Sequence, residues 1–177
     1  YKSTDKALSL SDVYHGVQLQ LFVYLSTLCE NGYAPAGILY CNLSDPIVSV
    51  NPEDSEEVIQ KKRFDMRRMD GIVLSEYDMP EHMGGKEILK TGKTATAKNF
   101  NSMFRHINRL IKKTAQNIYG GYFPIKCTED ACKWCEYAQL CRFDGAFSGC
   151  MVNTVPNLKN DEVWELLEKE VLENEMD

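Results

Sequence analysis

The residues whose type and spacing most clearly predict chemistry are three cysteines near the C-terminal end, Cys132, Cys135 and Cys141. Two residues separate the first pair, so both thiolates can point into one site across a tight turn, and the third cysteine follows after five more residues. Thiolates at such spacings bind zinc or an iron-sulfur cluster. We therefore predict a metal-binding segment; buried structural thiols or a disulfide framework are the competing interpretation.

This spacing leaves the fourth ligand open. Three thiolates leave a tetrahedral site one ligand short. Cys127, five residues before Cys132, is the nearest candidate, Cys150 is another, and a residue outside this chain is the third possibility. The total of seven cysteines is odd, and no leader or apolar run long enough to cross a bilayer is present, so we expect a reducing, cytoplasmic location with no membrane partner.

The net charge of −6 is unevenly distributed along the 177 residues. Residues 161–177 hold eight acids and one lysine, whereas the rest of the chain holds 19 basic and 18 acidic residues. The body is therefore about neutral, and the overall charge does not exclude an anionic partner such as DNA. With 44% apolar residues, the chain is long enough for one well-formed core with a small appendage.

In the N-terminal half, hydrophobic patterning predicts the elements that position these residues. Residues 1–3 are predicted to end a strand, a helix of about four turns follows from Val13 with Asp12 as its N-cap, and residues 38–43 are a buried strand. Strand, helix and strand over this length predict a βαβ unit with parallel strands. A charged helix over residues 52–68 then leads to a short edge strand at 71–74.

In the C-terminal half, residues 77–98 are predicted to form a mobile loop. Within it, residues 91–94 resemble the end of a phosphate-binding loop, but the earlier glycine of that motif is missing, and we interpret them as a surface loop. An amphipathic helix is predicted from Ser102, capped by Asn99 or Asn101. The basic residues of this helix form a solvated face or contact phosphate. Elsewhere in the chain, we interpret His15, His82 and His106 as structural or exposed residues. An acidic helix is predicted over residues 161–174.

Taken in order, the motifs of both ends resemble one family. A strand ending in Tyr1, Lys2 and Ser3, followed by a helix with Gln20 and Tyr24 in a Gln-x-x-x-Tyr pattern, is similar to the RecB-like branch of the PD-(D/E)xK nucleases. Near the C-terminal end, the C-x2-C-x5-C pattern is followed by Arg-Phe-Asp. The two motifs together resemble the nuclease domain of the B subunits of AddB/RexB-type helicase-nucleases.

The resemblance implies a fold and a function. The fold class would be α/β, a restriction-endonuclease-like PD-(D/E)xK core with a small mixed sheet flanked by helices. The core would occupy residues 1–126, a cysteine-rich iron-sulfur segment residues 127–150, and an acidic helix and tail residues 151–177. The parent would be a magnesium-dependent DNA exonuclease that forms a heterodimer with the helicase-nuclease A subunit in double-strand break processing and recombinational repair.

The resemblance also implies roles for single residues. Lys2, Gln20 and Tyr24 would be catalytic, and the backbone carbonyl of Tyr1 would be a ligand of Mg²⁺. Three cysteines would hold a 4Fe-4S cluster, namely Cys132, Cys135 and Cys141, with the fourth ligand upstream of this chain. The physical role of the cluster would be to fasten the C-terminal segment to a remote part of the polypeptide.

Two departures from the family pattern bear on activity. The catalytic aspartate of the family would immediately precede Tyr1, and the first cluster cysteine would lie far upstream, so we interpret the chain as a fragment and expect that it cannot cut DNA by itself. The alternative is a non-catalytic zinc or iron-sulfur module that binds DNA or protein. A third interpretation is a free-standing zinc protein with Cys127 as a ligand.

Overall fold

The centre of the molecule is a small mixed sheet of three strands in the order β1-β2-β3. The computed structural model describes residues 7–43, 47–90, 93–122, 124–125, 127–128, 131–147 and 152–174. β1 (Gly37–Tyr40) pairs antiparallel with β2 (Asp70–Leu74), and β3 (Thr94–Ala95) pairs parallel with β2. The predicted α/β class with a small mixed sheet is confirmed, whereas the strand predicted at residues 1–3 lies outside the described residues.

β2 is the middle strand of this sheet, so its prediction as an edge strand is wrong. Its residues are almost all buried because both of its edges pair with neighbours and both of its faces are covered. Ile72 packs into the main core, while the adjacent Val73 points to the other face and packs in a second, smaller core. Gly71 is required at this position, because a Cβ atom there would collide with the carbonyl oxygen of Ile38 on β1.

Two helices replace the single N-terminal helix that the sequence predicted. α1 (Leu10–Tyr14) ends before Gly16, whose φ of 81° lies in the left-handed region, and α2 (Gln20–Glu30) starts after the turn. Ser9 is the N-cap of α1, because its side chain accepts a hydrogen bond from the backbone N–H of Asp12. The prediction of Asp12 as the N-cap is therefore wrong by one turn.

The segment predicted as a loop over residues 77–98 contains regular structure. It forms two short 3₁₀ helices, η1 (Glu81–Met83) and η2 (Gly85–Ile88), followed by β3. Ile88 and Leu89 are buried against Val73, and this contact covers the second face of the sheet. The sequence signal was misleading because Gly, Lys and Thr dominate the segment, while its few apolar residues carry the packing.

The longer helices agree better with the sequence. α3 (Glu56–Met66) lies within the predicted charged helix and buries no residue. α4 (Ala97–Tyr119) begins before Ser102 because Thr96 and Asn99 form a capping box. The predicted acidic helix is α6 (Asn160–Asn174), and the short α5 (Ala138–Cys141) lies in the cysteine-rich segment.

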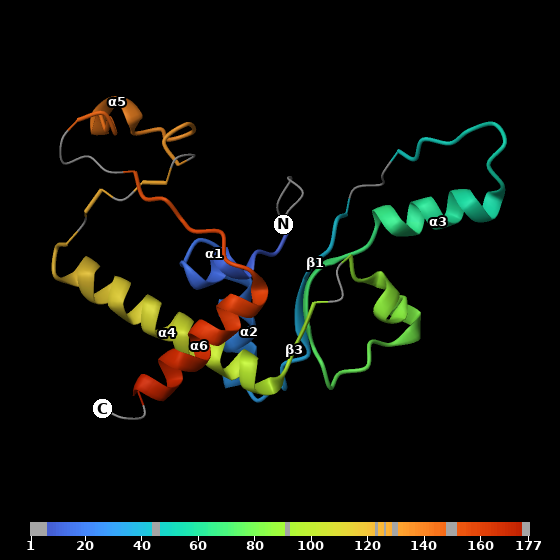
Figure 1. The fold of residues 1–177 in the computed structure, drawn as a ribbon, viewed down its shortest axis with the longest axis horizontal. Coiled ribbons are helices and arrows are strands. Elements are labelled where there is room, and N and C mark those ends of the chain that lie inside the picture. Colours follow the sequence, from blue (N-terminus) through green and yellow to red (C-terminus); the bar gives the residue numbers. More distant parts are fainter. Residues whose placement is uncertain are drawn as a thin grey trace.

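Helices α1, α2, α4 and α6 gather beside the sheet and bury the main core (Figure 1). α6 packs against both α4 and α1, and its residues Val163 and Leu167 are fully buried. The acidic helix is therefore docked into the core. The cysteine-rich segment with α5 and the arm with α3 project from opposite sides of this body (Figure 1).

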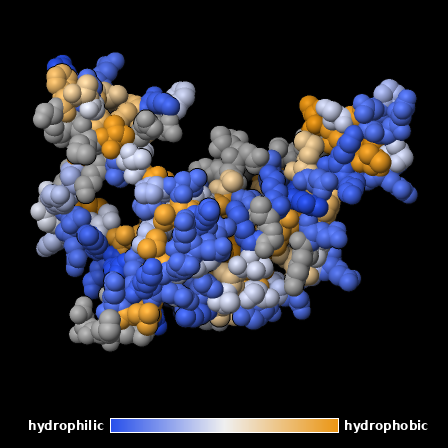
Figure 2. All heavy atoms as spheres, in the orientation of Figure 1, coloured by the Kyte–Doolittle hydropathy of each residue, from blue (hydrophilic) through white to orange (hydrophobic). Residues whose placement is uncertain are grey.

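Apolar side chains remain at the surface of both projections (Figure 2). Trp134 in the cysteine-rich segment is 90% exposed, and Ile47 in the arm before α3 is exposed to a similar extent. Within the described residues, no helix combines the length and the apolar character that crossing a bilayer would need.

Candidate active site and cysteine-rich segment

The first turns of α2 bring together two of the residues predicted to be catalytic. The side-chain amide of Gln20 donates a hydrogen bond of 2.7 Å from Nε2 to the hydroxyl oxygen of Tyr24. Both side chains face solvent, and Tyr24 is 58% exposed. This geometry follows from the helix itself, because residues four apart lie one above the other on the same face.

The opposite face of α2 explains this orientation. Phe22 is fully buried and packs against Phe100 and Phe104 of α4, with ring centroids 6.2 Å apart in each pair. With this face fixed in the core, Gln20 and Tyr24 must point outward. The other two predicted site residues, Tyr1 and Lys2, lie outside the described residues, so the structure does not test their placement.

The cysteine-rich segment brings one of its predicted ligands, Cys132, next to Cys127. The pKa of Cys132 lies above its ordinary value, first because its thiol hydrogen-bonds the sulfur of Cys127. Local desolvation and the negative charges that Cys127 and Cys135 would carry as thiolates add to this rise. Cys141 is the last residue of α5 in the same segment.

The donor chemistry of this segment suits a soft metal centre. Cys127, Cys132, Cys135 and Cys141 are all free thiols, and the last three are exposed. Among the described residues, however, no set of three or more Cys, His, Asp or Glu side chains is arranged so that it could hold a metal ion. The described part of the chain therefore supplies suitable ligands without a completed site.

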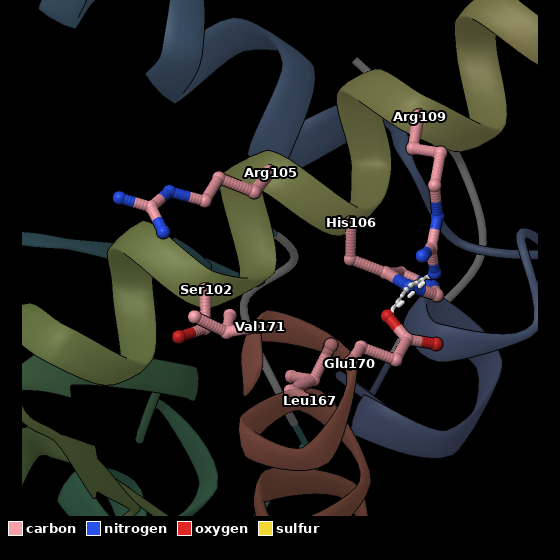
Figure 3. Close-up of a pocket in the computed structure, with 7 residues that line it drawn as sticks. All are labelled: Ser102, Arg105, His106, Arg109, Leu167, Glu170 and Val171. Carbon is pink, nitrogen blue, oxygen red and sulfur yellow. Dashed lines mark hydrogen bonds and ion pairs between the residues drawn. The ribbon is translucent and has the colours of Figure 1, made fainter. Parts of the chain in front are cut away.

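A groove of about 270 Å³ lies between α4 and α6 (Figure 3). Its lining residues come from these two helices, namely Ser102, Arg105, His106, Arg109, Leu167, Glu170 and Val171. The carboxylate of Glu170 points toward His106 and Arg109, at 2.8 Å from Nδ1 and 2.5 Å from Nη2 respectively (Figure 3).

The groove is held together through α1. The hydroxyl of Tyr14 donates to Glu170 over 3.1 Å, and the carbonyl oxygen of Tyr14 lies 2.8 Å from Nε2 of His106. The two rings also stack, with centroids 4.6 Å apart. Because both ring nitrogens of His106 are engaged, neither is available to a metal ion, in agreement with its interpretation as a structural residue.

Burial raises the pKa of the Tyr14 hydroxyl above its ordinary value. The negative charge of Glu170 and its hydrogen bond to the hydroxyl raise it further, because both favour the neutral phenol, while Arg109 partly opposes this effect. The chemistry of the groove is thus that of a polar junction between three helices.

The fold agrees with a comparison to models of protein families. Residues 1–142 match the PD-(D/E)XK nuclease superfamily. The chain belongs to this superfamily. The matched region contains the Tyr1-Lys2-Ser3 motif, α2, the sheet and the three predicted cluster cysteines, so the PD-(D/E)XK resemblance drawn from the two ends is confirmed.

Curated relatives of this PD-(D/E)XK chain are named as the B subunit of an ATP-dependent helicase/deoxyribonuclease. The protein of Thermoanaerobacter sp. (strain X514) is 32% identical over 97% of this chain, and that of Clostridium acetobutylicum is 32% identical over 98%. A third, from Acetivibrio thermocellus, is 29% identical over 96% of the chain. The chain spans about 17% of the length of these relatives.

The structure also reveals polar residues that sequence reasoning missed. Gln18, Asp70 and Lys93 all hydrogen-bond the backbone of residues 7–9, which lie four to six positions after Ser3. Asp70 carried the one usable signal, since it is an acid at the start of an otherwise apolar strand. Lys93 lies in the segment predicted as a surface loop, but its side chain is mostly buried beside Asp70.

Proposed function

We propose that this chain is the nuclease domain of a longer helicase/deoxyribonuclease B subunit that cuts DNA strands during double-strand break processing and recombinational repair. The observation that carries the proposal is the hydrogen-bonded pair Gln20 and Tyr24 on the outer face of α2, within the region that matches the nuclease superfamily. The names of the relatives support the same parent. DNA is then the substrate, and the helicase-nuclease A subunit is the partner.

In this proposal the chain's own residues bind and orient the scissile phosphate. The Lys2 ammonium stabilises negative charge that develops on the phosphate oxygens, a contribution that grows as water is excluded from the site. Gln20 and Tyr24 restrain one another through their hydrogen bond. They therefore present a fixed pair whose N–H and O–H groups can donate to the DNA strand and whose oxygens can accept from Lys2.

Magnesium ligands are incomplete within the described residues, which hold no suitable acidic cluster. We assign the carbonyl of Tyr1 as one ligand and a carboxylate from the longer polypeptide as another, and when bound there Mg²⁺ would activate water and neutralise phosphate charge.

Cys132, Cys135 and Cys141 would hold a 4Fe-4S cluster together with a cysteine from the longer polypeptide. Its role would be structural, because metal binding supplies folding free energy and would fasten this projecting segment to a distant part of the protein. The hydrogen bond between Cys127 and Cys132 favours a second candidate, a zinc-binding module in which Cys127 is the fourth thiolate.

Two experiments test these proposals. The full-length protein should degrade linear DNA in magnesium. Lys2→Ala should abolish this activity while DNA binding in calcium persists, and equal activity of the variant would refute the role of Lys2.

Metal analysis of anaerobically purified full-length protein should give iron with a visible absorption band that is lost in Cys135→Ser. Stoichiometric zinc that depends on Cys127 would instead favour the second candidate.

A further inference from the structure

The backbone of Leu8 is held by two charged side chains that are distant in sequence. Its N–H donates to Oδ2 of Asp70 over 2.5 Å, and its carbonyl oxygen accepts from Nζ of Lys93 over 2.9 Å. Nζ of Lys93 also lies 3.4 Å from Oδ1 of Asp70, and the two side chains are only 22% and 8% exposed. One ion pair thus binds both polar groups of a single residue.

Gln18 completes this arrangement from the turn between α1 and α2. Its Nε2 donates to the carbonyl oxygen of Ala7 over 3.3 Å, and its Oε1 accepts from the N–H of Ser9 over 3.2 Å. Residues 7–9 belong to no helix or strand, yet three side chains satisfy four of their backbone groups. We call these three side chains, Gln18, Asp70 and Lys93, the cradle.

These contacts fix position more strictly than apolar packing would. The Leu8 side chain is buried, but apolar contacts are non-directional and allow a segment to slide or rotate. Hydrogen bonds to charged groups are directional and about twice as strong as neutral ones. A single hydrogen bond from Leu8 to Asp70 would satisfy the buried N–H group. Here the carbonyl oxygen of Leu8 is bound as well, by Lys93.

The location of the cradle relates it to the proposed site. Ala7 follows Lys2 by five residues, and Gln18 precedes Gln20 by two. We propose that Gln18, Asp70 and Lys93 are positioning residues for the nuclease reaction: they hold residues 7–9, which lie between Lys2 and α2 in the sequence, against the sheet and the turn that leads into α2, where Gln20 lies. This inference rests on the proposed function, because it gives the cradle its role through Lys2 and Gln20.

The test compares variants of the full-length protein with magnesium and linear DNA. Lys93→Met keeps the length and apolar stem of the side chain but removes its charge and donors. We expect kcat to fall by about 10- to 100-fold, since small displacements of catalytic groups have effects of this size, while KM changes by less than about twofold. Lys93→Arg, which keeps the charge and can still donate to Leu8, should recover most of kcat.

Lys62→Met is the matched control. It removes a lysine of α3 that pairs with Asp54 at 2.6 Å and takes no part in the cradle, so it should leave kcat unchanged. Hydrogen exchange of the Leu8 amide provides a readout independent of activity, because it should be at least about tenfold faster in Lys93→Met and unchanged in Lys62→Met.

The outcomes separate the inference from the proposed function. A wild-type protein that does not cut DNA refutes the nuclease function and, with it, the positioning role. An active wild type in which Lys93→Met retains its kcat refutes the positioning role alone. Equal losses of kcat in Lys93→Met and Lys93→Arg, or a fall in DNA binding that accounts for the whole loss, would also overturn it.

Discussion

Glu170 is the acid that joins three helices, and its replacement by glutamine tests how much that junction stabilises the fold. Glu170→Gln keeps the size of the side chain and leaves one oxygen that can accept from the Tyr14 hydroxyl. The second oxygen becomes an amide nitrogen, which cannot accept from His106 or Arg109. The variant therefore removes two contacts of one carboxylate oxygen with little change in packing.

The magnitude follows from the burial of the two partners. Arg109 is half exposed, so losing this pair should cost less than about 1 kcal/mol. His106 is only 5% exposed, and losing the contact between its Nδ1 and a charged carboxylate oxygen should cost about 1–3 kcal/mol. The buried contact with His106 dominates, and we expect a total destabilisation of about 1–3 kcal/mol, or a decrease in Tm of about 2–12 °C for a domain of this size.

Thermal and urea denaturation would measure this effect, and the same helix offers a matched control. Glu168→Gln also removes one negative charge from α6, but Glu168 pairs with Lys98 at the surface, where both side chains are well exposed. Its cost should stay below about 1 kcal/mol. If the two variants lose the same stability, the effect comes from the charge of α6 as a whole, and the argument from the burial of His106 is wrong.

Two further predictions concern the same three helices. Leu167→Ala should lower the free energy of unfolding by about 2–5 kcal/mol, because Leu167 is fully buried in the main core. Leu172→Ala, on the exposed side of α6, should change it by less than about 0.5 kcal/mol. Denaturation in urea would compare the two variants. Stability should also fall as the pH rises above about 10, because the unfolded chain then ionises Tyr14 while the raised pKa in the fold keeps the hydroxyl neutral. Tyr14→Phe should flatten this alkaline loss, and an unchanged pH profile in that variant would refute the assignment.

Local patterns predicted some parts of the molecule well. The apolar stripes of α4 and α6 follow helical spacing, and the Gln20 and Tyr24 pair follows from a spacing of four within one helix. The sequence was less informative about where each helix begins and ends, because one or two residues set these boundaries. Gly16 divides a helix that looks continuous by apolar periodicity, and the Thr96 capping box extends α4 beyond its predicted start.

The cradle could not be predicted because its contacts join distant residues. Leu8 and Asp70 are 62 positions apart, and Leu8 and Lys93 are 85 apart. Lys93 lay in a stretch whose composition indicated a loop, and nothing in its neighbours marks it as buried. Only the parallel pairing of β3 with β2 brings Lys93 beside Asp70.

Two acids from distant elements, Asp70 and Glu170, bind residues at the two ends of α1. These contacts explain why so short a helix is held in one position in the fold. A helix of five residues is not stable by itself, because its nucleation costs more than its few hydrogen bonds return. Asp70 and Lys93 hold Leu8 just before α1, and Glu170 and His106 hold Tyr14 at its end. In its first turn, the Ser11 hydroxyl donates to the carbonyl of Pro156 over 2.8 Å. Tertiary polar contacts along its length therefore replace the stability that α1 lacks, and they tie the segment after the N-terminal motif to the sheet and to the C-terminal helix.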